Sequence, residues 1–174
     1  MQIPDSFLLM IMMLVLVIFV VLFILSGLMV LKEWERVVIF RLGRYHGIKG
    51  PGIIWKTPIF DHVILKASLQ DQSTDVDTGR YISSEDSTRR VEGIVAWRID
   101  DLKKYALSID KHQQSIATAV HHHVLKVAES MMSEAVYMDV DELNSEVKAA
   151  LEPTFSKWGL KIIKIDLHTA PYFG

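Results

Sequence analysis

Cysteine is absent from the 174-residue sequence. These residues can therefore form no disulfide, thiolate nucleophile, iron–sulfur cluster or S-palmitoyl anchor, and the redox compartment stays open. The sequence also has no excess of positive charge, because it contains 19 Lys and Arg and 21 Asp and Glu. Nucleic acid, which selects basic surfaces, is therefore not an expected partner.

Motifs of common catalytic sites are lacking too. The sequence contains no G-x-S-x-G, Walker A or G-x-G-x-x-G pattern. The best candidate metal ligands are His121, His122 and His123, but successive helical residues point about 100° apart, so their imidazoles diverge. We predict a surface histidine run, with a metal site between subunits or a pH-sensitive contact between subunits as the open alternative. No enzymatic activity, cofactor, metal or small-molecule substrate is expected.

Charged residues are missing from one long run, Phe7–Leu31. As a helix, its twenty-five residues would rise roughly 37 Å, against a hydrocarbon core of about 30 Å, so it can cross a bilayer with some tilt. The run is too long for a signal peptide and lacks the polar face of a soluble helix. The sequence predicts a single-pass membrane protein, with a membrane segment over residues 1–31 and one domain over 32–174.

The residues that flank this run predict its orientation. Asp5 is the only charged side chain before the run, whereas five basic residues follow it: Lys32, Arg36, Arg41, Arg44 and Lys49. The positive-inside rule then places the N-terminus outside and the domain in the cytoplasm, in a membrane of unknown identity. Ser26 and Gly27 are the small residues near the inner end, where another helix could approach closely, so we expect partner contacts there first.

The domain begins with strand-forming segments rich in β-branched residues. They are Val37–Leu42, Ile53–Lys56, Val63–Leu69 and, longest, Arg89–Asp100. One face of the last strand is apolar and should pack on the core. Its other face carries Arg90, Glu92 and Arg98, which either pair with a neighbouring copy or are simply solvated.

After Asp100 the apolar period changes from two to about 3.6, which predicts helices. Asp101 should cap a short helix to Leu107, and Asp110 with Gln113 should form the capping box of a second helix. The predicted buried stripe of that second helix is Ile116, Val120, Val124, Val127 and Met131.

A third helix is predicted after Asp141, and Pro153 should kink it or end its regular part. Its apolar residues recur every four positions, at Leu143, Val147, Leu151 and Phe155. A final strand is expected over Leu160–Leu167. The fold class is therefore α+β, with antiparallel strands, then helices, then one strand.

Two short apolar segments follow the span closely, Ile53–Trp55 and Ile59–Phe60. They could form a shallow second attachment to the membrane, or they could be ordinary core. Both interpretations stay open at the level of the sequence.

Four segments carry a family resemblance: Glu33–Arg44 (EWERVVIFRLGR), Gly50–Gly52, Ala96–Ile99 and Trp158–Ile162. They resemble the stomatin branch of the stomatin/prohibitin/flotillin/HflK-C (SPFH, band-7) superfamily. The resemblance implies a membrane-anchored, non-enzymatic scaffold that oligomerises with itself or its relatives, or organises membrane protein assemblies.

Stomatin-like proteins typically continue into a long Ala- and Glu-rich coiled coil, whereas this sequence stops at Gly174. We therefore expect the usual closure of a cage to be missing. A second function stays open on that ground, namely a small accessory subunit docked onto a larger membrane complex such as a protease, a transporter or a respiratory assembly.

Overall fold

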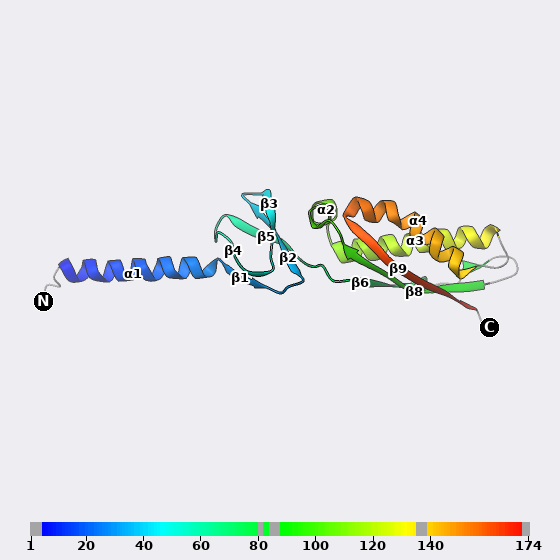
Figure 1. Ribbon diagram of the computed structural model, residues 1–174, viewed down its shortest axis with the longest axis horizontal. Helices are drawn as coiled ribbons and strands as arrows, with labels where there is room; N and C mark the ends of the chain where they lie inside the picture. Colours follow the sequence, from blue (N-terminus) through cyan, green and yellow to red (C-terminus); the bar gives the residue numbers. More distant parts are fainter. Residues whose placement is uncertain (1–4, 80–81, 84–87, 135–138, 172–174) are drawn as a thin grey trace. The chain divides into compact units, whose positions relative to one another are not determined.

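The computed structural model describes residues 5–79, 82–83, 88–134 and 139–171 (Figure 1). The chain forms two compact units, Met1–Ala67 and Ser68–Gly174, and each is described by itself. The architecture is α+β, as predicted. The predicted division into residues 1–31 and 32–174 remains a prediction.

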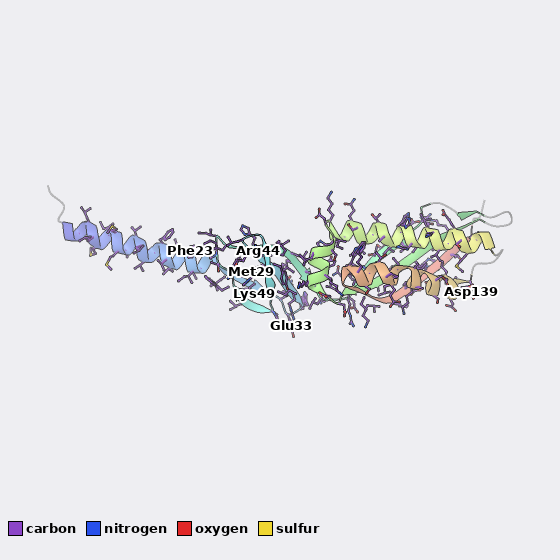
Figure 2. All side chains as sticks on the ribbon, turned by 90° about the horizontal axis from the view of Figure 1, so that it is seen from above. Phe23, Met29, Glu33, Arg44, Lys49 and Asp139 are labelled. Carbon is purple, nitrogen blue, oxygen red and sulfur yellow. The ribbon has the colours of Figure 1, made fainter. Side chains whose placement is uncertain are left out.

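The first unit opens with helix α1 (Asp5–Ser26), whose side chains from Phe7 onward are exposed except for the half-buried Phe23 (Figure 2). Its segment Phe7–Ser26 has a mean hydropathy of 3.6, and in the described part of the chain it alone is long and apolar enough to cross a membrane. The expectation that this helix reaches Leu31 was wrong. Leu28–Leu31 forms strand β1 instead, because an unbroken apolar run is equally compatible with helix and strand.

Strand β1 pairs antiparallel with β4 (Gly52–Trp55), and we call this two-stranded element the ribbon. A second, three-stranded sheet has the order β3 (Arg44–Lys49), β2 (Glu35–Arg41), β5 (Asp61–Ser68). Buried side chains from both sheets form one small core: Leu31, Val37, Ile39 and Ile54, with Met29 and Val63 packed against it. The ribbon therefore already uses one face for the interior of this unit.

The second unit is built on β8 (Thr88–Ile99), which pairs antiparallel with β6 (Gln72–Asp77), β7 (Ile82–Ser83) and β9 (Leu160–Pro171). The predicted alternation along β8 is confirmed. Its buried side chains are Val91, Val95, Trp97 and Ile99. The final strand is four residues longer than predicted, because it stays paired with β8 as far as Pro171.

Three helices complete this unit: α2 (Leu102–Ser108), α3 (His112–Glu134) and α4 (Val140–Trp158). Figure 1 shows α3 and α4 running together along the sheet. The buried row of α4 is the predicted one, but the row of α3 continues through Ala128 and Met132 rather than Val127 and Met131. A row spaced strictly by four tilts across a helix, and two such rows pack together as ridges into grooves.

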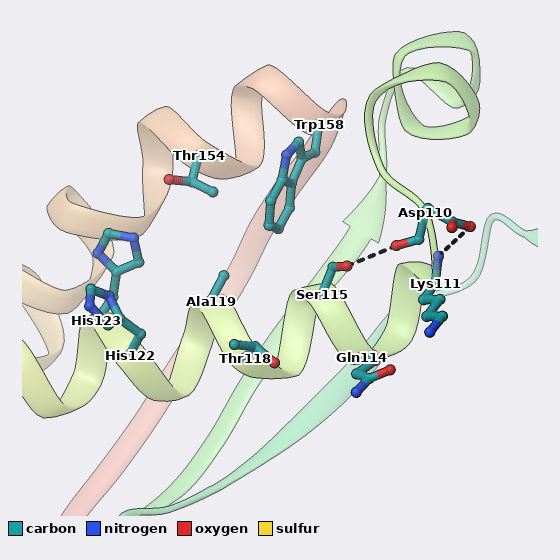
Figure 3. A pocket seen from close by; sticks show the side chains of 10 residues that line it. All are labelled: Asp110, Lys111, Gln114, Ser115, Thr118, Ala119, His122, His123, Thr154 and Trp158. Carbon is teal, nitrogen blue, oxygen red and sulfur yellow. Dashed lines mark hydrogen bonds between the residues drawn. The ribbon is translucent and has the colours of Figure 1, made fainter.

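The helix ends show which capping predictions hold. Asp101 caps α2 by accepting from the N–H of Lys104 (3.0 Å), as predicted. The capping box was wrong, because Asp110 accepts from the neighbouring N–H of Lys111 (2.9 Å) and its carbonyl accepts from the hydroxyl of Ser115 (2.8 Å; Figure 3).

Helix α4 departs from the prediction at two points. Its cap is Asp139 rather than Asp141. Pro153 does not end the helix, which continues to Trp158. Pro153 and Ala149 are both exposed, so water can bind the carbonyl that loses its helical partner.

Gly159 ends α4 in the left-handed conformation (φ 74°), and its N–H donates to the carbonyls of Phe155 and Ser156. Its own carbonyl accepts from the N–H groups of Asp100 and Asp101, both at 2.9 Å. A Cβ at this position would overlap the carbonyl oxygen of Asp101. This glycine therefore joins the end of α4 to the beginning of α2.

We expect Gly159→Ala to lower the free energy of unfolding by about 3 kcal/mol, because left-handed strain adds to a backbone overlap. Gly79→Ala is the matched control, since Gly79 also has a positive φ (65°) but open space around its Cα, and should cost about 1 kcal/mol. Urea unfolding of the full chain in detergent, followed by circular dichroism, measures both. Equal losses would show that the overlap is relieved without cost.

Candidate membrane-contact site

The outer face of the ribbon is apolar and exposed. It consists of two cross-strand pairs, Leu28 opposite Trp55 and Val30 opposite Ile53. Their exposures are 47%, 43%, 73% and 75%. Since the inner face of the same strands lies in the core, both faces of the ribbon are apolar, which is unusual for an antiparallel element in water.

This face follows α1 without a linker, through a close joint at Gly27. The indole N–H of Trp55 donates to the carbonyl of Ile24 (3.1 Å), and the N–H of Lys56 donates to the carbonyl of Gly27 (2.9 Å). A Cβ on Gly27 would overlap Trp55 and the Lys56 carbonyl oxygen, so another residue would force the joint apart. The ribbon is therefore fixed to the end of the helix.

Three more exposed apolar residues, Leu42, Ile59 and Phe60, lie on neighbouring loops. The N–H of Leu42 donates to the carbonyl of Phe60 (3.2 Å), which connects the β2–β3 turn to the β4–β5 loop. This loop begins directly after Lys56, at the joint, so Ile59 lies within about 11 Å of it along the chain. The loop cluster and the ribbon face consequently lie near the same end of the unit.

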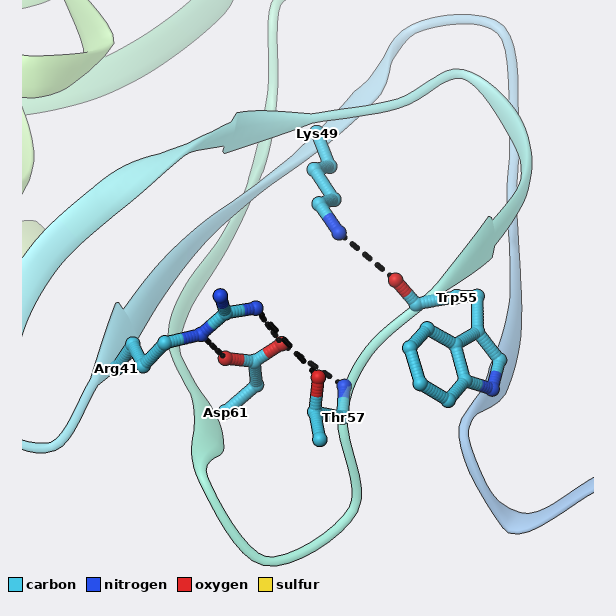
Figure 4. Close-up of polar contacts among 5 residues, drawn as sticks. All are labelled: Arg41, Lys49, Trp55, Thr57 and Asp61. Atoms are coloured by element: carbon cyan, nitrogen blue, oxygen red, sulfur yellow. Dashed lines mark hydrogen bonds and ion pairs between the residues drawn. The ribbon is translucent and has the colours of Figure 1, made fainter. Parts of the chain in front are cut away.

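A buried carboxylate holds this loop in place (Figure 4). Arg41 binds Asp61 through two bonds, Nε to Oδ1 at 2.6 Å and Nη2 to Oδ2 at 3.0 Å. Asp61 also accepts from the N–H of Thr57 (2.8 Å), and its side chain is 1% exposed. Because the paired Arg41 and the Thr57 N–H favour the charged form, the pKa of Asp61 is held well below its usual range.

The five residues predicted as partner contacts lie in different parts of the chain. Ser26 ends α1 and donates to the carbonyl of Phe23 (2.8 Å), and Gly27 packs on its own chain as described above. On β8, Arg90 forms ion pairs with Asp77 and with Glu92 (2.9 Å), while Arg98 is exposed. Partner contact at all five residues remains a prediction.

The histidine run lies on α3. His122 and His123 line a shallow hollow of about 660 Å³ between α3 and α4, with Trp158 and Thr154 on the opposite side (Figure 3). Burial, followed by the neighbouring His122 and Lys126, lowers the pKa of His123. Among the described residues, no group of three His, Asp or Glu is arranged to hold a metal ion.

An apolar helix joined directly to a β-structure with an exposed apolar face, followed by an α+β unit, is typical of a membrane-associated protein. The SPFH domain / Band 7 family model matches residues 29–171, and the chain belongs to this family. The matched segment begins within β1 and ends with β9.

Curated relatives agree with this assignment. The chain is 26% identical over 153 residues to a stomatin homologue of Pyrococcus horikoshii, which covers 88% of this chain and 57% of the relative. It is 28% identical over 152 residues to an uncharacterised protein of Archaeoglobus fulgidus, covering 87% and 61%. Similarity to mouse stomatin is 24% over 140 residues, covering 79% and 49%. The chain thus spans about half to three fifths of the length of these relatives.

We expect Asp61→Asn to lower the stability of the full chain near neutral pH, because Arg41 and the Thr57 N–H lose their charged partner. The stabilisation from a carboxylate with a depressed pKa is complete above the ordinary value of about 4 and is lost as the pH falls through the folded value. The gap in urea midpoint between wild type and variant should therefore narrow below about pH 4.

Asp75→Asn is the control for this prediction, since the described residues offer the exposed Asp75 carboxylate no ion-pair partner. It removes the same charge and should leave the urea midpoint nearly unchanged. A midpoint gap for Asp61→Asn that stays constant from neutral pH to about pH 3 would contradict a role for the ionised carboxylate.

Proposed function

We propose that the chain is a membrane-anchored, non-enzymatic scaffold of the stomatin type, in which α1 spans the bilayer and the outer face of the ribbon lies in the membrane interface. The observation that carries this proposal is that the exposed apolar side chains of α1 are followed, directly after the joint, by the exposed apolar face of Leu28, Val30, Ile53 and Trp55. Of the two sequence interpretations of this segment, burial in the core suits Ile54, whereas membrane contact suits Ile53 and Trp55.

The energetic case rests on the hydrophobic effect. A side chain of this size gains about 1.5–3 kcal/mol when it is transferred fully out of water. The four ribbon residues can thus contribute several kcal/mol even if each is transferred only in part. Trp55 fits this location in particular, since its indole combines an apolar ring with a polar N–H, as tryptophans at membrane interfaces do.

Assembly follows from the confinement that the anchor imposes. A protein held at a bilayer meets its neighbours in two dimensions, where weak lateral contacts act at a high effective concentration. The mixed charges of β8, including Arg90, Glu92 and Arg98, are the proposed lateral contact. The orientation with the N-terminus outside and the extramembrane region in the cytoplasm is part of the same proposal.

The absence of cysteine allows a direct test of interface insertion. With an environment-sensitive fluorophore on Ile53→Cys or Val30→Cys, the full chain in phosphatidylcholine vesicles should emit at shorter wavelength and be quenched by brominated acyl chains. The physical reason is transfer of the label from water to the hydrocarbon boundary. Leu107→Cys, which labels an exposed leucine on α2 of the second unit, is the matched control, and its label should emit as in water.

A truncation gives an independent readout. Removing residues 1–26 keeps β1 intact, and the remainder should still sediment in part with vesicles through the ribbon. Substituting Val30 and Ile53 by Ser should abolish this binding. Water-like emission at positions 30 and 53, together with a fully soluble truncated chain, would exclude insertion of the ribbon.

The assembly state separates the scaffold from the alternative of an accessory subunit. Purified in a mild detergent, a scaffold should give one large homogeneous assembly of this chain alone by mass photometry. Foreign subunits that co-purify in fixed ratio would instead establish the accessory role within a larger membrane complex.

A further inference from the structure

Charge is divided unevenly between the two units. Residues 27–67 contain seven Lys and Arg but three Asp and Glu, whereas residues 68–174 contain twelve Lys and Arg and seventeen Asp and Glu. The near-neutral total of the whole chain therefore conceals a basic segment directly after α1 and an acidic second unit. Such a basic segment beside a membrane span attracts anionic lipid.

The acidic residues of this segment leave much of its positive charge uncompensated. Asp61 forms its ion pair with Arg41. Glu35 pairs with Lys66 (2.9 Å) and also accepts a hydrogen bond from the N–H of Lys32 (3.0 Å). Glu33 is exposed on the turn between β1 and β2. The basic residues near the joint have no carboxylate partner among the described residues.

Three cations are available at the end of the unit where α1 enters. The Lys56 N–H binds the carbonyl of Gly27, so this lysine sits at the joint itself. Lys49 Nζ donates to the carbonyl of Trp55 (2.8 Å), which uses one of its three hydrogens. Arg44 is exposed at the start of β3, directly after the β2–β3 turn, and Figure 2 draws it and Lys49 at the level of Met29 along the axis of α1.

We propose that Arg44, Lys49 and Lys56 bind the phosphate groups of anionic phospholipids in the leaflet at the C-terminal end of α1. The proposal rests on interface insertion of the ribbon, which brings these cations to headgroup depth. The C-terminal end of a helix carries partial negative charge, which favours cations there even before lipid binds. Their N–H donors then meet phosphate oxygens while Ile53 and Trp55 lie against the acyl boundary.

The test uses the full chain reconstituted in phosphatidylcholine vesicles that contain about one third phosphatidylglycerol. Electron spin resonance of spin-labelled lipids gives the association constant of phosphatidylglycerol relative to phosphatidylcholine. Wild type should select phosphatidylglycerol, and the triple variant Arg44→Gln, Lys49→Gln, Lys56→Gln should reduce this selectivity by roughly threefold or more.

A matched control removes the same charge from the second unit, through Lys126→Gln, Lys148→Gln and Lys157→Gln, and should keep the wild-type selectivity. In the wild type, raising NaCl from about 0.05 M to about 0.5 M should also weaken the selectivity, because screening acts on exposed charges. This salt series tests the proposal even if the triple variant misfolds.

The outcomes separate this inference from the proposed function. Equal association of both lipids with the wild type, or selectivity that is indifferent to salt and to the triple variant, would overturn the headgroup site. The label at position 53 can still report insertion in neutral vesicles in that case. Water-like emission at position 53 would instead contradict both the interface insertion of the ribbon and the headgroup site that rests on it.

Discussion

The close contact at Gly27 is the constraint on which the rest of the first unit depends. No side chain fits between the end of α1 and strand β4, and two hydrogen bonds, from Trp55 to Ile24 and from Lys56 to Gly27, close the joint. A flexible linker would let a span and a domain move independently. Here the helix end and the ribbon are one element, so a helix placed across a bilayer also determines where the outer face of the ribbon lies.

A second constraint acts through the buried Asp61. A carboxylate this well shielded from water is costly unless it is fully paired, and Arg41 with the Thr57 N–H supplies that pairing. The result is a fixed β4–β5 loop that presents Ile59 and Phe60 to solvent. Both constraints serve the same end of the unit, where an apolar surface is held outward instead of collapsing into the core.

The sequence predicts the larger elements well because their patterns are long. The alternation along β8 and the four-residue spacing of α4 each leave one solution for the buried face, and the family motifs lead to the SPFH domain.

The end of α1 could not be predicted, because Leu28–Leu31 is as apolar as the helix before it and only pairing with β4 selects the strand. The sequence could not decide whether Ile53 and Trp55 pack in the core or contact the membrane, for a related reason. Periodicity does not say whether the second apolar face of a strand is covered. The pair of Arg41 and Asp61 joins residues twenty apart in sequence and leaves no local signal.

The role of Gly27 in the structure differs from the role that its sequence position suggests. A small residue near the end of a span suggests close approach by another helix, but the space beside Gly27 is filled by Trp55 and Lys56 of the same chain. The rest of α1 presents mostly large side chains, which specify little about a lateral partner. Recognition by this protein is therefore better sought at the membrane surface, where the ribbon supplies apolar area and Arg44, Lys49 and Lys56 supply charge, than along the helix itself.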